Sequence, residues 1–136
     1  MALIMVADDT ADIVELLKDI LESRGHQVVS VSDGVAMIEK AKTWRPHLII
    51  ADLMMPGAYG SAAYKALQDD PATAGIPVVF LTAVPEMQAR KVVPESPKTR
   101  LLFKPIMPNV LMKAISEMLP SGAPPPPAAP PAAPPA

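Results

Sequence analysis

The sequence predicts a doubly wound α/β domain, in which a five-stranded parallel sheet is covered by helices on both faces. Short runs of aliphatic residues alternate along the chain with longer segments of helical periodicity. These runs are apolar throughout, which is typical of strands buried on both faces of a parallel sheet. The chain has 136 residues, a length that suits one domain with a single core.

Five strands are predicted, each followed by a helix. The strands are Leu3–Ala7, Val28–Val31, Leu48–Ala51, Val78–Leu81 and Leu101–Phe103. The clearest helix is Ala11–Arg24, because its apolar residues recur at spacings of three and four and Gly25 supplies a stop. Weaker helical patterns cover residues 34–44, 61–68, 85–92 and 108–119. Asp33 is a candidate helix cap, and Pro108 suits a first helical turn.

The last 17 residues have a different composition. Of residues 120–136, 15 are proline or alanine, and none is charged. We therefore expect a globular domain over residues 1–119 and a disordered or polyproline-like tail or linker over residues 120–136. Such a tail cannot contribute to the core.

Composition excludes several classes of function. The chain has no cysteine, so disulfides, thiol nucleophiles and thiolate metal sites are excluded. The net charge of -2 gives no reason to expect nucleic-acid binding by this domain. No apolar run reaches the roughly 18 residues that cross a bilayer, and the first residues do not resemble a signal peptide. We expect a cytoplasmic protein without membrane contact.

Polar residues follow four of the predicted strands. Asp8 and Asp9 follow the first strand, Asp52 follows the third, Thr82 the fourth and Lys104 the fifth. Taken singly, these residues have structural explanations, such as helix capping or turn formation. In a doubly wound sheet, however, the carboxyl ends of the strands form the ligand-binding edge, so all five would meet there.

Together these residues indicate phosphoryl-transfer chemistry. Three carboxylates at close range repel one another unless a cation or hydrogen-bond donors offset the charge. A cluster with oxygen ligands alone favours Mg²⁺. A nearby hydroxyl and ammonium are then suitable partners for phosphate oxygens.

These motifs resemble the receiver domain of two-component response regulators, of the kind found in chemotaxis regulators. The resemblance covers residues 1 to about 119 and rests on the Asp8-Asp9 pair, Asp52 in Asp-Leu-Met-Met-Pro-Gly, Thr82-Ala83 and Lys104-Pro105. The separations of 43, 30 and 22 residues from Asp9 through Asp52 and Thr82 to Lys104 fit the family. The resemblance implies a flavodoxin-like strand order 2-1-3-4-5 for the sheet.

The resemblance also implies a role for each residue. Asp52 would take a phosphoryl group from a phosphohistidine. Asp8, Asp9, Asp52 and the backbone carbonyl of Met54 would hold Mg²⁺, with Asp9 as a direct ligand and Asp8 acting largely through water. Lys104 and the Thr82 hydroxyl would contact phosphoryl oxygens.

The implied partners follow from this chemistry. The phosphoryl donor would be a sensor histidine kinase or a phosphotransfer protein, and a downstream protein would read the phosphorylated state. Phosphorylation-dependent homodimerisation is one form that this reading could take. The protein would catalyse only its own phosphorylation and dephosphorylation, so it would not be an enzyme in the usual sense.

Three features depart from the family pattern. Leu101 stands three residues before Lys104, where the family usually has an aromatic switch residue, and Phe103 does not occupy that position. Prolines 94 and 97 interrupt the segment in which the fourth helix would continue. Met54 and Val84 are apolar where polar side chains could orient water toward a phosphoryl group, which predicts slow loss of the phosphate.

Two other readings of the sequence stay open. Leu101 and the prolines mildly favour a pseudo-receiver that binds partners without phosphorylation, whereas the intact set of strand-end residues argues against it. A phosphohydrolase of the haloacid dehalogenase type also uses an aspartate nucleophile, Mg²⁺ and a lysine. That class needs a second acid two residues after the nucleophile, where this chain has Met54.

Overall fold

The computed structural model describes residues 2–52, 60–83, 87 and 98–119. Its sheet has five strands: β1 (Leu3–Ala7), β2 (Gln27–Val31), β3 (Leu48–Asp52), β4 (Val78–Thr82) and β5 (Thr99–Phe103). They lie in the order β2-β1-β3-β4-β5, and each neighbouring pair is parallel. The predicted fold class and strand order are confirmed.

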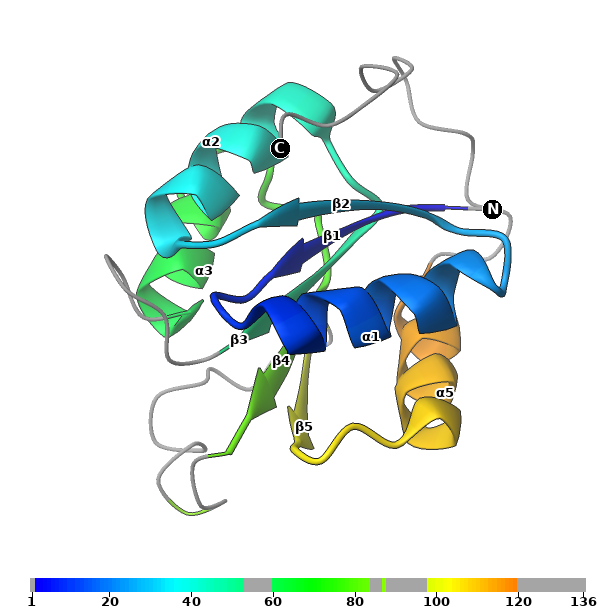
Figure 1. Ribbon diagram of the computed structural model, residues 1–136. Coiled ribbons are helices and arrows are strands. Elements are labelled where there is room, and N and C mark those ends of the chain that lie inside the picture. The colour runs from blue at the N-terminus through cyan, green and yellow to red at the C-terminus, as the bar shows by residue number, and fades with distance from the viewer. Residues whose placement is uncertain (1, 53–59, 84–86, 88–97, 120–136) are drawn as a thin grey trace.

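Helices cover both faces of this sheet. They are α1 (Ala11–Glu22), α2 (Gly34–Trp44), α3 (Gly60–Gln68) and α5 (Pro108–Met118). Figure 1 shows α2 and α3 on one side of the sheet, with α1 and α5 on the other. The helix predicted for residues 85–92 lies outside the described residues except for Met87, and the predicted tail at 120–136 lies wholly outside them.

The helix ends follow local chemistry. Asp33 caps α2 by accepting a 2.7 Å hydrogen bond from the backbone amide of Ala36, as predicted. Pro108 is the first residue of α5, where its missing amide hydrogen costs nothing. Gly25 has a φ of 87°, a left-handed conformation that favours glycine, and α1 ends just before it at Glu22.

The core consists of two apolar layers, one on each face of the sheet. The layer under α2 and α3 includes Met37, Phe80 and Tyr64, with the Tyr64 and Phe80 rings in edge contact. The layer under α1 and α5 includes Leu17 and Leu111. Because neighbouring strand residues face opposite layers, every strand contributes to both.

The prediction that the strands are buried on both faces holds for the centre of the sheet but not for its edges. Every residue of β1, β3 and β4 is buried. At the two edges, β2 is only partly buried, and every residue of β5 is partly exposed. Among the described strands, β2 and β5 each pair with one neighbour, so one side of each is not covered by another strand.

Two histidines support the start of β1. The Nδ1 atom of His26 accepts a hydrogen bond from the amide of Ala2 at 3.2 Å, and Nδ1 of His47 accepts one from the amide of Leu3 at 3.0 Å. Partial burial, followed by the positive charge of the amino terminus, lowers the pKa of the His26 imidazole below its ordinary value of 6.5. An accepting Nδ1 must be unprotonated, so this contact requires a neutral ring.

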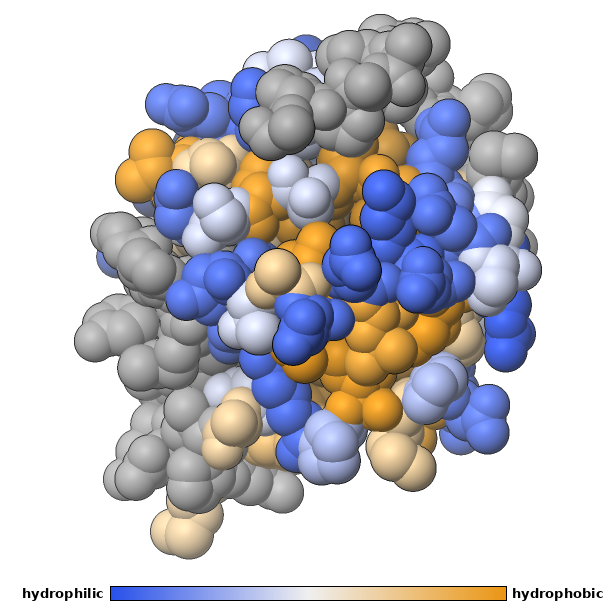
Figure 2. All heavy atoms as spheres, viewed as in Figure 1, coloured by the Kyte–Doolittle hydropathy of each residue, from blue (hydrophilic) through white to orange (hydrophobic). Residues whose placement is uncertain are grey.

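Some apolar surface remains uncovered beside α1 and α5. Figure 2, viewed as in Figure 1, shows apolar residues at the surface where these helices lie, with polar residues beside them. Leu16 of α1 is 43% exposed. Within the described part of the chain, no helix has the length and apolar character to cross a membrane.

Candidate phosphoryl-acceptor and metal site

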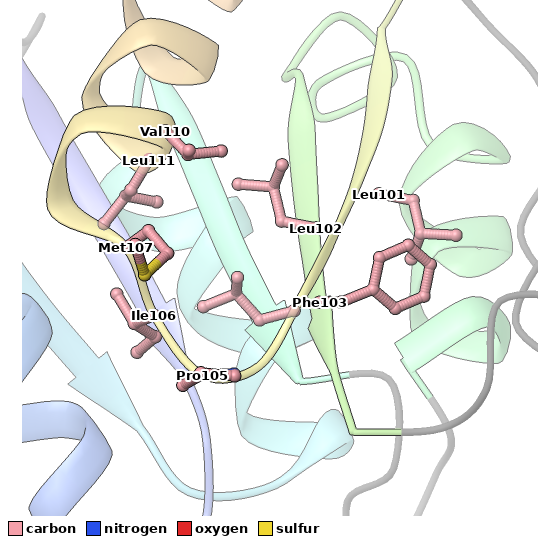
Figure 3. Close-up of a pocket in the computed structure, with 9 residues that line it drawn as sticks. Leu101, Leu102, Phe103, Pro105, Ile106, Met107, Val110 and Leu111 are labelled. Carbon is pink, nitrogen blue, oxygen red and sulfur yellow. The ribbon is translucent and has the colours of Figure 1, made fainter.

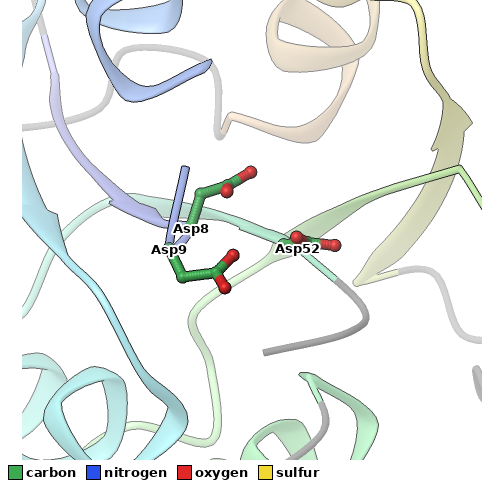
Figure 4. Close-up of side chains that lie close together, drawn as sticks. All are labelled: Asp8, Asp9 and Asp52. Atoms are coloured by element: carbon green, nitrogen blue, oxygen red, sulfur yellow. The ribbon is translucent and has the colours of Figure 1, made fainter. Parts of the chain in front are cut away.

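Three carboxylates meet at the carboxyl ends of β1 and β3. One oxygen each from Asp8, Asp9 and Asp52 lies within 4.8 Å of the other two. Figure 4 shows the three side chains converging beyond the ends of these strands. Asp8 and Asp52 are buried, with 3% and 8% exposure, whereas Asp9 is exposed. The cluster therefore has a buried side and a side open to solvent.

Both carboxylate oxygens of Asp8 already have partners. Its Oδ1 accepts a hydrogen bond from the amide of Thr10 at 2.9 Å, and its Oδ2 lies 3.4 Å from Nζ of Lys104. Its backbone amide donates to the carbonyl of Val31 in β2. Asp8 is thus fixed by both its main chain and its side chain, while the carboxylate of Asp9 remains available on the open side.

Lys104 lies between the two buried carboxylates. Its Nζ is 3.4 Å from Oδ2 of Asp8 and 3.6 Å from Oδ2 of Asp52, and its side chain is 20% exposed. The backbone amide of Lys104 donates a 2.8 Å hydrogen bond to the carbonyl of Thr82, which extends the pairing of β4 with β5. The Lys104-Pro105 peptide bond is cis. The lysine offsets part of the negative charge of the cluster.

Thr82 is the last residue of β4 and is completely buried. The preceding residue, Leu81, is in register with Asp52 of β3. The main chain therefore brings Thr82 to the same sheet edge as the carboxylates and Lys104. This placement agrees with the sequence prediction.

The five predicted side chains lie together at the carboxyl end of the sheet, as their positions after the strands predicted. They are Asp8, Asp9, Asp52, Thr82 and Lys104. The remaining predicted metal ligand, the carbonyl of Met54, lies outside the described residues, as does Val84. Sequence reasoning did not identify the ion pair between Lys104 and Asp8. Its members are 96 residues apart, and neither carries a local signal for the other.

The donor set fits a magnesium ion. Mg²⁺ prefers oxygen ligands and is usually held by one or two carboxylates with waters completing the octahedron. Among the described residues, these three carboxylates and the ammonium of Lys104 leave two negative charges to balance, which matches a divalent cation. Asp9 and Asp52 would provide carboxylate ligands for the ion, while Asp8 would keep its contacts with the Thr10 amide and with Lys104.

Comparison with protein-family models gives one decisive match. The model described as "Response regulator receiver domain" covers residues 4–116. The chain belongs to this family. Receiver domains are signalling modules of two-component systems rather than ordinary enzymes, and they bind Mg²⁺ at an acidic pocket. They interact with histidine kinases or phosphotransfer proteins.

Individual relatives agree with this assignment. Protein PilH of Pseudomonas aeruginosa is 32% identical over 120 residues, a match that covers 88% of this chain and 98% of PilH. The DNA-binding response regulator MtrA of Mycobacterium tuberculosis is 30% identical over 116 residues. That match covers 85% of this chain but 50% of MtrA, so the chain spans about half the length of that relative.

Among solved structures, the chemotaxis protein CheY4 of Vibrio cholerae is similar throughout the receiver domain. The two share 26% sequence identity and superpose with a TM-score of 0.78. The match covers 88% of this chain and 99% of CheY4. Sheet order, family model and structural similarity therefore all describe the same receiver fold.

Proposed function

We propose that this receiver domain accepts a phosphoryl group on Asp52 from the phosphohistidine of a sensor histidine kinase or phosphotransfer protein in the cytoplasm. The observation that carries the proposal is the position of the Asp52 carboxylate. It lies within 4.8 Å of the Asp8 and Asp9 oxygens and 3.6 Å from Nζ of Lys104. An acid in this setting is next to both a cation site and a fixed positive charge.

The reaction is a direct exchange of bonds at phosphorus. A carboxylate oxygen of Asp52 attacks the phosphorus atom, the phosphorus-nitrogen bond of the phosphohistidine breaks, and the imidazole leaves with the electron pair. The product is an aspartyl phosphate. Little covalent assistance is needed, so positioning and charge neutralisation account for the catalysis.

The residues around Asp52 divide this work. Lys104 pairs with a phosphoryl oxygen, and the Thr82 hydroxyl donates to another once the group is attached. Asp8 holds Lys104 in place through its 3.4 Å contact, and Asp9 and Asp52 provide carboxylate ligands for Mg²⁺. When bound, Mg²⁺ supplies positive charge against the phosphoryl oxygens. By family resemblance, the carbonyl of Met54 is a further ligand.

The consequence of phosphorylation is a change in protein contacts. We propose that residues 1–119 form the phosphorylated module and that residues 120–136 form a polyproline-like tail or linker. The family match over residues 4–116 supports the first boundary, and the proline-alanine composition supports the second. A downstream protein or a second copy of this chain would bind the phosphorylated form.

The proposal is tested by incubating the protein with Mg²⁺ and acetyl phosphate and measuring the intact mass. We expect the mass of one added phosphoryl group in the native protein and none in Asp52→Asn. Asp69→Asn, which changes an exposed acid beyond the end of α3, is the matched control and should be phosphorylated normally. Absence of any Asp52-dependent gain in mass would favour the pseudo-receiver reading instead.

A further inference from the structure

An apolar cavity lies between β5 and the first turn of α5. Its volume is about 260 Å³, and every described residue that lines it is apolar. Figure 3 shows Leu102 pointing from β5 toward Val110 and Leu111 of α5. Ile106 and Met107, on the segment that leads into the helix, line the same side. The cavity therefore suits an apolar ligand rather than a charged one.

The mouth of this cavity is open to solvent. Met107 and Val110, which are three residues apart at the start of α5, are 59% and 51% exposed. Single exposed apolar side chains are common on protein surfaces, but two that adjoin an apolar cavity form a continuous apolar surface. Covering such a surface with another apolar segment removes it from water and is favourable.

The segment that follows α5 has the chemistry to cover this mouth. Residues 120–136 lie outside the described residues, and 15 of these 17 are proline or alanine, without a charged side chain. Proline-rich segments dock in apolar grooves at a small loss of conformational entropy, because the extended chain is already stiff. A charged partner would lose its hydration against this lining and gain no polar contact from the described side chains. The uncharged tail is the better match.

The tail is also long enough to reach the cavity. The 11 residues of α5 begin beside the cavity and place the start of the tail about 16 Å away along the helix. Ser121 and Gly122 are turn-forming residues that allow the chain to reverse there. Residues 124–136 then span up to about 40 Å in a polyproline conformation. The repeated Ala-Ala-Pro-Pro sequence at 128–135 is therefore within reach of the mouth.

We propose that residues 128–135 dock across the mouth of the apolar cavity between β5 and α5 of the same chain. Attachment to α5 makes the docking intramolecular, so the effective concentration of the tail is on the order of millimolar and a weak contact suffices. The docked tail shields Met107 and Val110, and a protein that binds this surface must displace it. The inference uses the tail assignment made above but requires no phosphoryl group on Asp52.

A spin label on the tail tests this docking in the full chain. The chain has no cysteine, so Ala132→Cys provides a single site for a nitroxide label. We expect severalfold stronger paramagnetic broadening of the Leu102 and Leu111 methyl resonances than of those of Val31. The reference is suitable because Val31 belongs to β2, at the opposite edge of the sheet from β5. Broadening that is absent at the cavity, or equal at Val31, would overturn the docking.

Two matched substitutions test the site itself. Val110→Lys places a charge at the mouth and should abolish the broadening at Leu102. Val35→Lys changes a residue of α2 with a similar exposure of 53% and should leave the broadening unchanged. Broadening that persists in Val110→Lys, or an equal loss in both variants, would overturn the proposed site.

A mixed sample separates docking within one chain from docking between chains. Spin-labelled protein is added to isotope-labelled protein without a spin label, and we expect no broadening at the cavity. Broadening there would assign the cavity to the tail of a second copy and overturn the intramolecular contact. Intact mass after treatment with acetyl phosphate measures phosphorylation of Asp52 separately. Failure of the docking would therefore leave the proposed phosphoryl transfer standing.

Discussion

Nζ of Lys104 lies 3.4 Å from Oδ2 of Asp8, although β3 and β4 separate their strands in the sheet. The same ammonium lies 3.6 Å from Asp52. One cation thus holds together the two buried acids of the cluster before any metal or phosphoryl group arrives. The Lys104 ammonium partly neutralises the negative charge of a site that also attracts Mg²⁺. Its removal should therefore affect metal binding and phosphoryl transfer differently.

Lys104→Met should bind Mg²⁺ more tightly and accept phosphate more slowly. Removing a positive charge next to the carboxylates eliminates repulsion toward the metal, which we expect to raise Mg²⁺ affinity by roughly tenfold. Phosphorylation should slow because a partner of the phosphoryl oxygens is lost. Calorimetric titration with Mg²⁺ and phosphorylation rates from intact mass check both effects. Weaker Mg²⁺ binding would show instead that Lys104 is needed to shape the site.

Asp9→Asn should reduce Mg²⁺ binding without weakening the metal-free protein. Asp9 is exposed and repels its two neighbours, so neutralising it should raise the free energy of unfolding by at most about 1 kcal/mol in the absence of metal. The stabilisation gained on adding Mg²⁺ should largely disappear. Thermal unfolding with and without Mg²⁺ measures both quantities. Asp19→Asn, on the exposed face of α1, is the control and should keep the full Mg²⁺ effect.

Asp33→Ala should destabilise the fold without changing the site. It removes the 2.7 Å hydrogen bond that caps α2, which typically lowers the free energy of unfolding by about 1 kcal/mol. Thr10→Ala is a matched comparison, because Thr10 stands at the start of α1 but its side chain makes no capping bond. Urea denaturation should show a smaller loss for Thr10→Ala. Equal losses would contradict the assignment of the cap.

The structure predicts that stability falls as the pH drops below about 6.5. The pKa of His26 is lowered in the folded protein, so the unfolded chain takes up a proton first and is favoured as the pH falls through 6.5. His26→Gln, which has no titrating ring, should lose less stability between pH 7.5 and 5.5. Urea denaturation at both pH values measures the difference. The same pH dependence in the variant would assign the effect to other groups.

The sequence predicted those features that depend on local or strand-end chemistry. The helix cap by Asp33 and the helix stop at Gly25 follow from short sequence patterns. The meeting of Asp52 and Lys104 follows from the rule that ligand-binding residues lie at the carboxyl ends of parallel strands. The cap of α2 and the end of the sheet that carries the site could therefore be predicted from the sequence, whereas α1 ends at Glu22, two residues before its predicted end at Arg24.

Other features depend on packing between distant segments and could not be predicted. The contact of Lys104 with Asp8 and the register of Thr82 with Phe103 are set by how the strands and loops dock. The histidine contacts at β1 arise in the same way. Arg45 adopts a φ of 46°, which its residue type does not favour. Pro46 discourages right-handed helical geometry in the residue before it, which agrees with α2 ending at Trp44, but it favours an extended conformation and gives no signal for the left-handed one.

Phosphorylation of Asp52 is the central claim, and trapping the modified residue tests it most directly. After treatment with Mg²⁺ and acetyl phosphate, borohydride reduction converts an aspartyl phosphate to homoserine, and peptide mass spectrometry identifies its position. We predict homoserine at position 52 alone, and none when Mg²⁺ is removed by a chelator. Homoserine at another aspartate, or none at position 52 in the presence of Mg²⁺, would contradict the account.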